Sequence, residues 1–155
     1  MICRILASVL ALSFTRNGLN LTAEGTPEPG TRASKDAEKA IISEFYAKYR
    51  KVANDQAPNV PTWCTFDSPV LVDQNILSHV ELSKYKALNI FFENQGAVYS
   101  ANLQEIRRYF SHREPWEDYD IYVFPPAMDW CIAFTHTQAY GKILVYVTGD
   151  TKKFS

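Results

Sequence analysis

Three short β-rich runs in the last third of the chain constrain the fold most. They cover residues 120–124, 129–135 and 142–148, and each is rich in β-branched and aromatic residues. A Pro-Pro pair separates the first two runs, where no central strand can continue. Because the links are too short for crossover connections, the runs predict an antiparallel three-stranded meander.

Side-chain alternation assigns the faces of the middle run. Successive side chains of a strand point to opposite faces, so Trp130, Ile132 and Phe134 are expected to share the core face. Cys131 and Ala133 then point to the opposite face, and their small size suggests that something else covers it.

Helical periodicity predicts a helix over residues 35–53. Ile41, Phe45, Tyr49 and Val52 recur at steps of four, four and three, which places them on one face of a helix. The serine before this segment is a suitable N-cap, and acidic residues in the first turn suit the helix dipole.

The middle of the chain predicts a hairpin followed by a second helix. Residues 88–100 carry aromatic and β-branched runs on either side of a turn that ends at Gly96. A helix over residues 84–92 is the competing interpretation, since short apolar runs are ambiguous. Asn102 and Glu105 have the spacing of a capping box, which predicts a short helix over residues 102–110 with Leu103, Ile106 and Phe110 on its apolar face.

The region before the hairpin is less regular. Residues 70–72 could form a short strand, and residues 75–82 a short helix. Taken together, the elements predict an α+β fold in which an N-terminal helix packs on an antiparallel sheet that ends in the three-stranded meander.

The first 30 residues are expected to lie outside the folded domain, which would cover residues 31–155. Residues 5–14 form an apolar run that is too short to span a bilayer and fits the central region of a signal peptide. A Pro/Gly-rich linker over residues 25–32 follows. The chain would be cytoplasmic if its start codon is mis-assigned and periplasmic or secreted if the leader is cleaved, with no stable membrane anchor in either case.

Charge and motifs exclude several classes of function. The 16 Lys and Arg residues against 17 Asp and Glu residues leave a net charge of −1, which argues against a nucleic-acid partner. No spacing of His and Cys suits a structural metal, and no phosphate- or dinucleotide-binding motif is present, so no metal or cofactor is expected. Cys64 and Cys131 could form one disulfide bond in an oxidising compartment, but Cys131 lies in a run that favours burial.

An acidic segment with interleaved aromatic residues is the leading candidate for a binding surface. Residues 114–120 carry four carboxylates in seven residues. Acidic groups attract a basic partner, and Trp and Tyr are frequent interface hot spots. The contacts expected for a basic protein partner are Glu114, Trp116, Glu117, Asp118 and Tyr119.

A catalytic or ligand-binding site is the alternative. His136 could act as a general base with Asp129, and Tyr122 or Tyr146 could line the pocket. A nucleophilic set would combine the same His and Asp with one of the two cysteines, and Glu117 with Asp120 could serve glycoside chemistry if both face a groove.

Two segments resemble known bacterial proteins. Residues 90–103 (IFFENQGAVYSANL) are similar to the hairpin of SUKH-superfamily proteins, many of which act as immunity proteins that neutralise toxins. Residues 120–136 resemble a strand-turn-strand pattern of small α+β proteins, some of them also linked to toxin immunity. The resemblance implies a non-catalytic protein-binding protein, such as an inhibitor of a basic toxin or nuclease, and it implies no particular binding residues. The alternative function is a small secreted enzyme or ligand-binding α+β protein that uses His136 and Asp129.

Overall fold

The computed structural model describes residues 28–51, 60–79, 81–113, 120–139 and 141–154, and its centre is a seven-stranded antiparallel sheet. The strand order is β1-β4-β3-β5-β6-β7-β2. The strands are β1 (Thr31–Arg32), β2 (Val70–Val72), β3 (Leu88–Phe92), β4 (Ala97–Ala101), β5 (Ile121–Phe124), β6 (Trp130–Ala139) and β7 (Lys142–Gly149). The helices are α1 (Lys35–Tyr49), α2 (Ile76–His79) and α3 (Leu103–His112), with 3₁₀ turns at Thr62–Thr65, Glu93–Gln95 and Thr151–Phe154.

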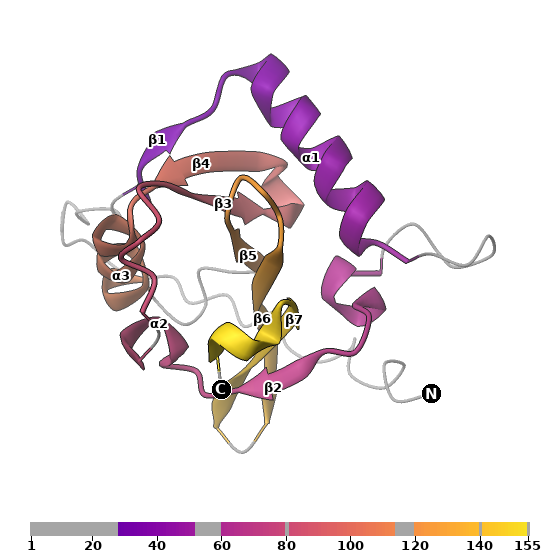
Figure 1. The fold of residues 1–155 in the computed structure, drawn as a ribbon, viewed down its shortest axis with the longest axis vertical. Coiled ribbons are helices and arrows are strands. Elements are labelled where there is room, and N and C mark those ends of the chain that lie inside the picture. The colour runs from indigo at the N-terminus through magenta and orange to yellow at the C-terminus, as the bar shows by residue number, and fades with distance from the viewer. Residues whose placement is uncertain (1–27, 52–59, 80, 114–119, 140, 155) are drawn as a thin grey trace, which may run out of the picture.

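Helices cover both faces of the sheet, so the fold has three layers (Figure 1). On one face the strand side chains pack with α2 and α3, and on the other they pack with α1. Trp130, Ile132 and Phe134 lie in the first cluster, whereas Cys131 and Ala133 lie in the second. The predicted division of faces in this strand is therefore confirmed, and α1 belongs to the layer that covers the small residues.

The α+β class and the meander β5-β6-β7 are confirmed, but the sheet is larger than the sequence predicted. The hairpin β3-β4 is also confirmed, with Gly96 in the left-handed conformation at φ 59°. Its strand β3 pairs with β5, so the hairpin and the meander form one continuous sheet. The alternative helix over residues 84–92 is wrong.

Each helix begins within one residue of its predicted start, but the ends differ. The helices α1 and α2 end earlier than predicted, and α3 ends two residues later. Ser34 caps α1 by accepting a hydrogen bond from the backbone N–H of Ala37, and the helix ends at Tyr49 rather than at residue 53. The capping box of Asn102 and Glu105 is present at the start of α3. The short helix expected over residues 75–82 is a single turn, α2.

The N-terminal edge of the sheet corrects the predicted linker. Thr31 and Arg32 pair with β4 as the edge strand β1, and Pro29 is buried. Gly30 has φ 126°, and a Cβ there would lie 2.5 Å from the backbone oxygen of Ser100. Only glycine suits this close approach, so the packed structure includes residues 29–32.

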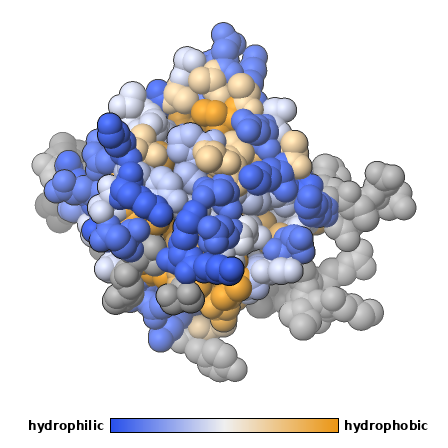
Figure 2. All heavy atoms as spheres, viewed as in Figure 1, coloured by the Kyte–Doolittle hydropathy of each residue, from blue (hydrophilic) through white to orange (hydrophobic). Residues whose placement is uncertain are grey.

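Polar side chains cover most of the face shown in Figure 2, with hydrophobic patches between them. Val70 and Leu71 of β2 are the large hydrophobic residues with high exposure in the described part of the chain, at 46% and 59%. None of the helices in the described ranges has the length and apolar character needed to cross a membrane.

Glu38 joins β1, α1 and β4 through its buried carboxylate. It lies 2.9 Å from both Arg32 Nε and Lys35 Nζ and accepts a hydrogen bond from the backbone N–H of Val98. The hydrogen bonds from Lys35 and Arg32 lower the pKa of Glu38 from 4.5 to about 2. The sequence placed this residue only in the first turn of a helix, where exposure is the usual outcome.

We expect Glu38 to make folding stability depend on acidic pH. Because its folded-state pKa is lowered, the carboxylate stabilises the protein above pH 4.5, and this contribution is lost as the pH falls toward 2. Urea midpoints of the wild type should therefore decline more steeply over this range than those of Glu38→Gln, which cannot titrate. Parallel declines in both proteins would contradict the prediction.

Candidate functional site

The five predicted partner contacts, Glu114, Trp116, Glu117, Asp118 and Tyr119, lie outside the described residues. The last carboxylate of the acidic segment, Asp120, is described and is 9% exposed. It immediately precedes β5 and faces the protein. The predicted binding surface therefore stays a prediction, and Asp120 has a different role.

Asp120 is the centre of a polar network between three parts of the chain. Its Oδ1 accepts a hydrogen bond from Trp63 Nε1 at 2.8 Å, and both carboxylate oxygens lie 3.1 Å from His136 Nδ1. The Trp63 ring also stacks on Tyr146 with a centroid distance of 5.5 Å. The His136 side chain is 60% exposed, so Asp120 orients an imidazole that is otherwise largely in solvent.

A second carboxylate, that of Glu93, bonds the residues next to this network. Its carboxylate accepts hydrogen bonds from the N–H and Oγ1 of Thr62 and from the hydroxyl of Tyr122, the last at 2.5 Å. Burial and the charge of Glu93 raise the pKa of Tyr122, so the hydroxyl stays protonated and donates. A cavity of about 360 Å³ lies beside this network and is lined by Tyr46, Arg50, Val60, Pro61, Glu93, Asn94 and Asp120.

The structure does not bring together the pair proposed for the alternative site. Asp129 and His136 are seven positions apart along an extended strand, which separates their backbones by about 20 Å. Asp129 pairs with Lys153, which lowers the pKa of Asp129. Tyr122 and Tyr146 both contact Trp63, but the carboxylate that contacts the His136 imidazole is Asp120.

The two cysteines of the described chain are free thiols. Cys131 is buried, as expected, and burial raises the pKa of its thiol well above the ordinary value. Cys64 is exposed in the 3₁₀ turn at Thr62–Thr65. The disulfide that an oxidising compartment would permit is not present, and a thiol with a raised pKa is a weak nucleophile.

A larger groove of about 610 Å³ lies between α2, α3 and the strands β6 and β7. Its apolar floor comprises Leu77, Phe110, Phe134, Ile143 and Val145. Phe110 and Phe134 pack against each other with a centroid distance of 4.3 Å. The remaining lining residues are Gln74, Asn75, Ser78, Gln104, Arg107, Arg108, Ser111 and Arg113.

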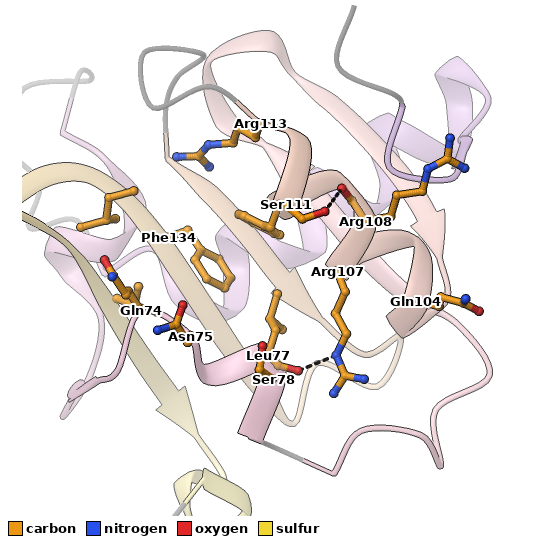
Figure 3. Close-up of a pocket in the computed structure, with 13 residues that line it drawn as sticks. Gln74, Asn75, Leu77, Ser78, Gln104, Arg107, Arg108, Ser111, Arg113 and Phe134 are labelled. Atoms are coloured by element: carbon orange, nitrogen blue, oxygen red, sulfur yellow. Dashed lines mark hydrogen bonds between the residues drawn. The ribbon is translucent and has the colours of Figure 1, made fainter.

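Three arginines and no carboxylates line this groove among the described residues. Arg107 donates a hydrogen bond from Nε to the carbonyl of Leu77 at 2.7 Å, which fixes its guanidinium beside α2. The guanidinium of Arg113 lies 5.4 Å from the centre of the Phe110 ring. Figure 3 shows Arg107 and Arg113 along the groove, whereas Arg108 projects away from Phe134.

Sequence reasoning missed both the network and the groove. Trp63 lies in a segment that carries no motif, and Glu93 lies in the predicted hairpin turn, where nothing in the sequence indicates that its carboxylate bonds to Thr62 and Tyr122. The groove had one usable signal, the concentration of Arg107, Arg108 and Arg113 on a single short helix and its cap.

The described residues contain no group of three or more His, Cys, Asp or Glu side chains that could hold a metal ion. Comparisons of the chain with protein-family models, with curated proteins and with solved structures found no match.

Proposed function

We propose that this chain is a non-catalytic protein-binding protein whose groove between α2 and α3 receives an acidic, partly apolar segment of a partner protein. The observation that carries the proposal is the lining of the groove, in which Arg107, Arg108 and Arg113 lie around an apolar floor. The volume of about 610 Å³ is typical of a binding site and suits a few side chains of a peptide.

Arginine is the side chain best suited to this recognition. Its planar guanidinium pairs with a carboxylate through two parallel hydrogen bonds. The bond from Arg107 to Leu77 uses only one N–H and holds the group in place, which reduces the entropy lost on binding. An apolar side chain of the partner would then cover Phe110 and the neighbouring floor.

A protein segment fits this groove better than a nucleic acid. Single-stranded nucleic acids are bound by exposed aromatic rings on which bases stack. Here Phe134 is 4% exposed and packs against Phe110, so the rings form a floor rather than a stacking platform. The overall charge of −1 adds no general attraction to phosphate.

The carboxylates of the polar network have a structural role in this proposal. The Glu93 carboxylate accepts from Thr62 and Tyr122, and the Asp120 carboxylate accepts from Trp63 and contacts His136. These bonds tie the 3₁₀ turn at Thr62–Thr65 to the sheet. Carboxylates that accept these bonds stabilise the fold.

Binding of a basic partner through residues 114–119, and the inhibition of a toxin that the resemblance implied, stay predictions. The groove proposal is independent of them because it depends on different residues and on the opposite charge in the partner.

The test is a selection from a displayed library of random peptides about eight residues long, followed by affinity measurements. Enriched peptides should carry Asp or Glu together with apolar residues. Their affinity should fall at least about tenfold in the double variant R107Q/R113Q, in proportion to the lost charge-assisted bonds. The matched control is K39Q/K86Q, which removes the same two positive charges from exposed positions outside the groove lining, and it should retain the affinity.

Three results would overturn the proposal. One is enrichment of Lys- or Arg-rich peptides, which would favour binding through the acidic segment 114–120. Another is equal loss of affinity in K39Q/K86Q and in R107Q/R113Q. The third is enrichment of no peptide together with binding of single-stranded oligonucleotides that is lost in R107Q/R113Q. Thermal melts of each variant establish that the groove is still folded.

A further inference from the structure

The strand β7 has an edge that its neighbour β2 covers only in part. β2 pairs through Val70↔Val147, Leu71↔Tyr146 and Val72↔Val145. After Val72 the chain turns away into α2, held by the hydrogen bond from the backbone N–H of Asn75 to the Asp73 side chain. In the part of the chain that the structure describes, no strand pairs with residues 142–144 on this side. We call this side of residues 142–144 the open edge.

The backbone groups of Ile143 point toward the open edge. The carbonyl of Leu144 accepts a hydrogen bond from Thr135 Oγ1, so it faces β6. The N–H and C=O groups of successive residues in a strand point to alternate sides. Those of Ile143 therefore face the same side as those of Val145, where β2 lies, and they offer one donor and one acceptor to an added strand.

The open edge adjoins the groove between α2 and α3. Ile143 and Val145 contribute to the groove floor, and Gln74 and Asn75, which follow β2, line the same groove. A segment extended along the open edge would thus send every second side chain toward Phe110, Arg107 and Arg113. Its other side chains would point to the opposite face of the sheet.

We infer that the acidic segment binds the groove as an extended β-strand, which pairs with Ile143 and continues the sheet where β2 leaves it. The inference rests on the proposed function and specifies how the partner is recognised. Main-chain hydrogen bonds to the open edge supply part of the affinity, while alternate side chains that meet the apolar floor and Arg107 and Arg113 supply specificity. The partner sequence should therefore alternate, with its acidic and apolar groove-facing residues two positions apart.

The first measurement uses an enriched library peptide and the full chain labelled with ¹⁵N. Saturation with the peptide should slow hydrogen exchange of the Ile143 amide at least about tenfold, because the amide gains a hydrogen bond. The amide of Leu144 serves as the internal control, since it faces β6 and its exchange should not change.

The second measurement scans the same peptide with single backbone N-methyl groups. Methylation at amides that face β7 should reduce affinity at least about tenfold, and methylation at the intervening amides should have little effect, because only alternate amides can pair. This two-residue periodicity is a result that a helical or irregular peptide would not give.

The outcomes separate the inference from the function on which it rests. One set of results would overturn the strand inference alone. The peptides would need Arg107 and Arg113, but their key residues would lie three or four positions apart. They would also tolerate N-methylation at every position and leave the Ile143 amide unprotected. Failure to find any peptide that depends on the two arginines would overturn both.

Discussion

Trp130→Ala should lower the free energy of unfolding by about 3–5 kcal/mol, as for other large buried aromatic residues. The Trp130 side chain is fully buried and lies between Tyr85 and Phe154, at centroid distances of 5.5 Å and 5.2 Å. Its Nε1 donates to the hydroxyl of Tyr85 at 2.9 Å. The substitution would remove the side chain that joins β6, the segment before β3 and the C-terminal turn. Chemical denaturation at neutral pH measures the effect.

Trp130→Phe is the control for this prediction. Phenylalanine keeps much of the apolar bulk and loses the indole N–H, so its cost should lie between those of the wild type and the alanine variant. A loss of less than about 1 kcal/mol in the free energy of unfolding of the alanine variant would lie in the range of ordinary surface substitutions. It would show that Trp130 does not lie in the core.

Local structure was predictable because its signals are local. The steps between Ile41, Phe45 and Tyr49 determine one helical face, and the spacing of Asn102 and Glu105 gives a capping box, whatever the rest of the chain does. Gly96 marks the hairpin for the same reason, since its positive φ is a property of one residue. These signals gave the α+β class and most of the elements.

The arrangement of the sheet was not predictable from such signals. The pairing of β3 with β5 joins residues about 30 positions apart, across α3. The strand β1 has two residues and no alternation to detect. Non-local pairing is decided by which strand edges and faces fit together in the folded protein, and the sequence pattern alone does not show this.

The candidate sites were missed for a related reason. The carboxylate that contacts His136 is Asp120, which immediately precedes β5, whereas Asp129, the candidate nearer in sequence, immediately precedes β6. Acidic side chains are usually expected on the surface, yet Asp120 and Glu38 are both buried and accept hydrogen bonds from other parts of the chain. The partners of a polar side chain decide its role, and here they come from distant segments.

Glu93→Ala is expected to lower the free energy of unfolding by about 2–4 kcal/mol, because it leaves buried donors without an acceptor. Thr62 and Tyr122 are both fully buried and direct their hydroxyl groups at this carboxylate. The matched control is Glu44→Ala on the exposed side of α1, which removes the same charge from a solvated position and should change stability by no more than about 0.5 kcal/mol.

A double-mutant cycle assigns the effect to the network. Tyr122→Phe removes one donor and little volume, so the loss from Glu93→Ala should be smaller in the Tyr122→Phe background, with a coupling of about 1 kcal/mol or more. Strict additivity would mean that water replaces the carboxylate without cost. In that case the bonds from Thr62 and Tyr122 would not be what holds the 3₁₀ turn at Thr62–Thr65, and with it Trp63, against the sheet.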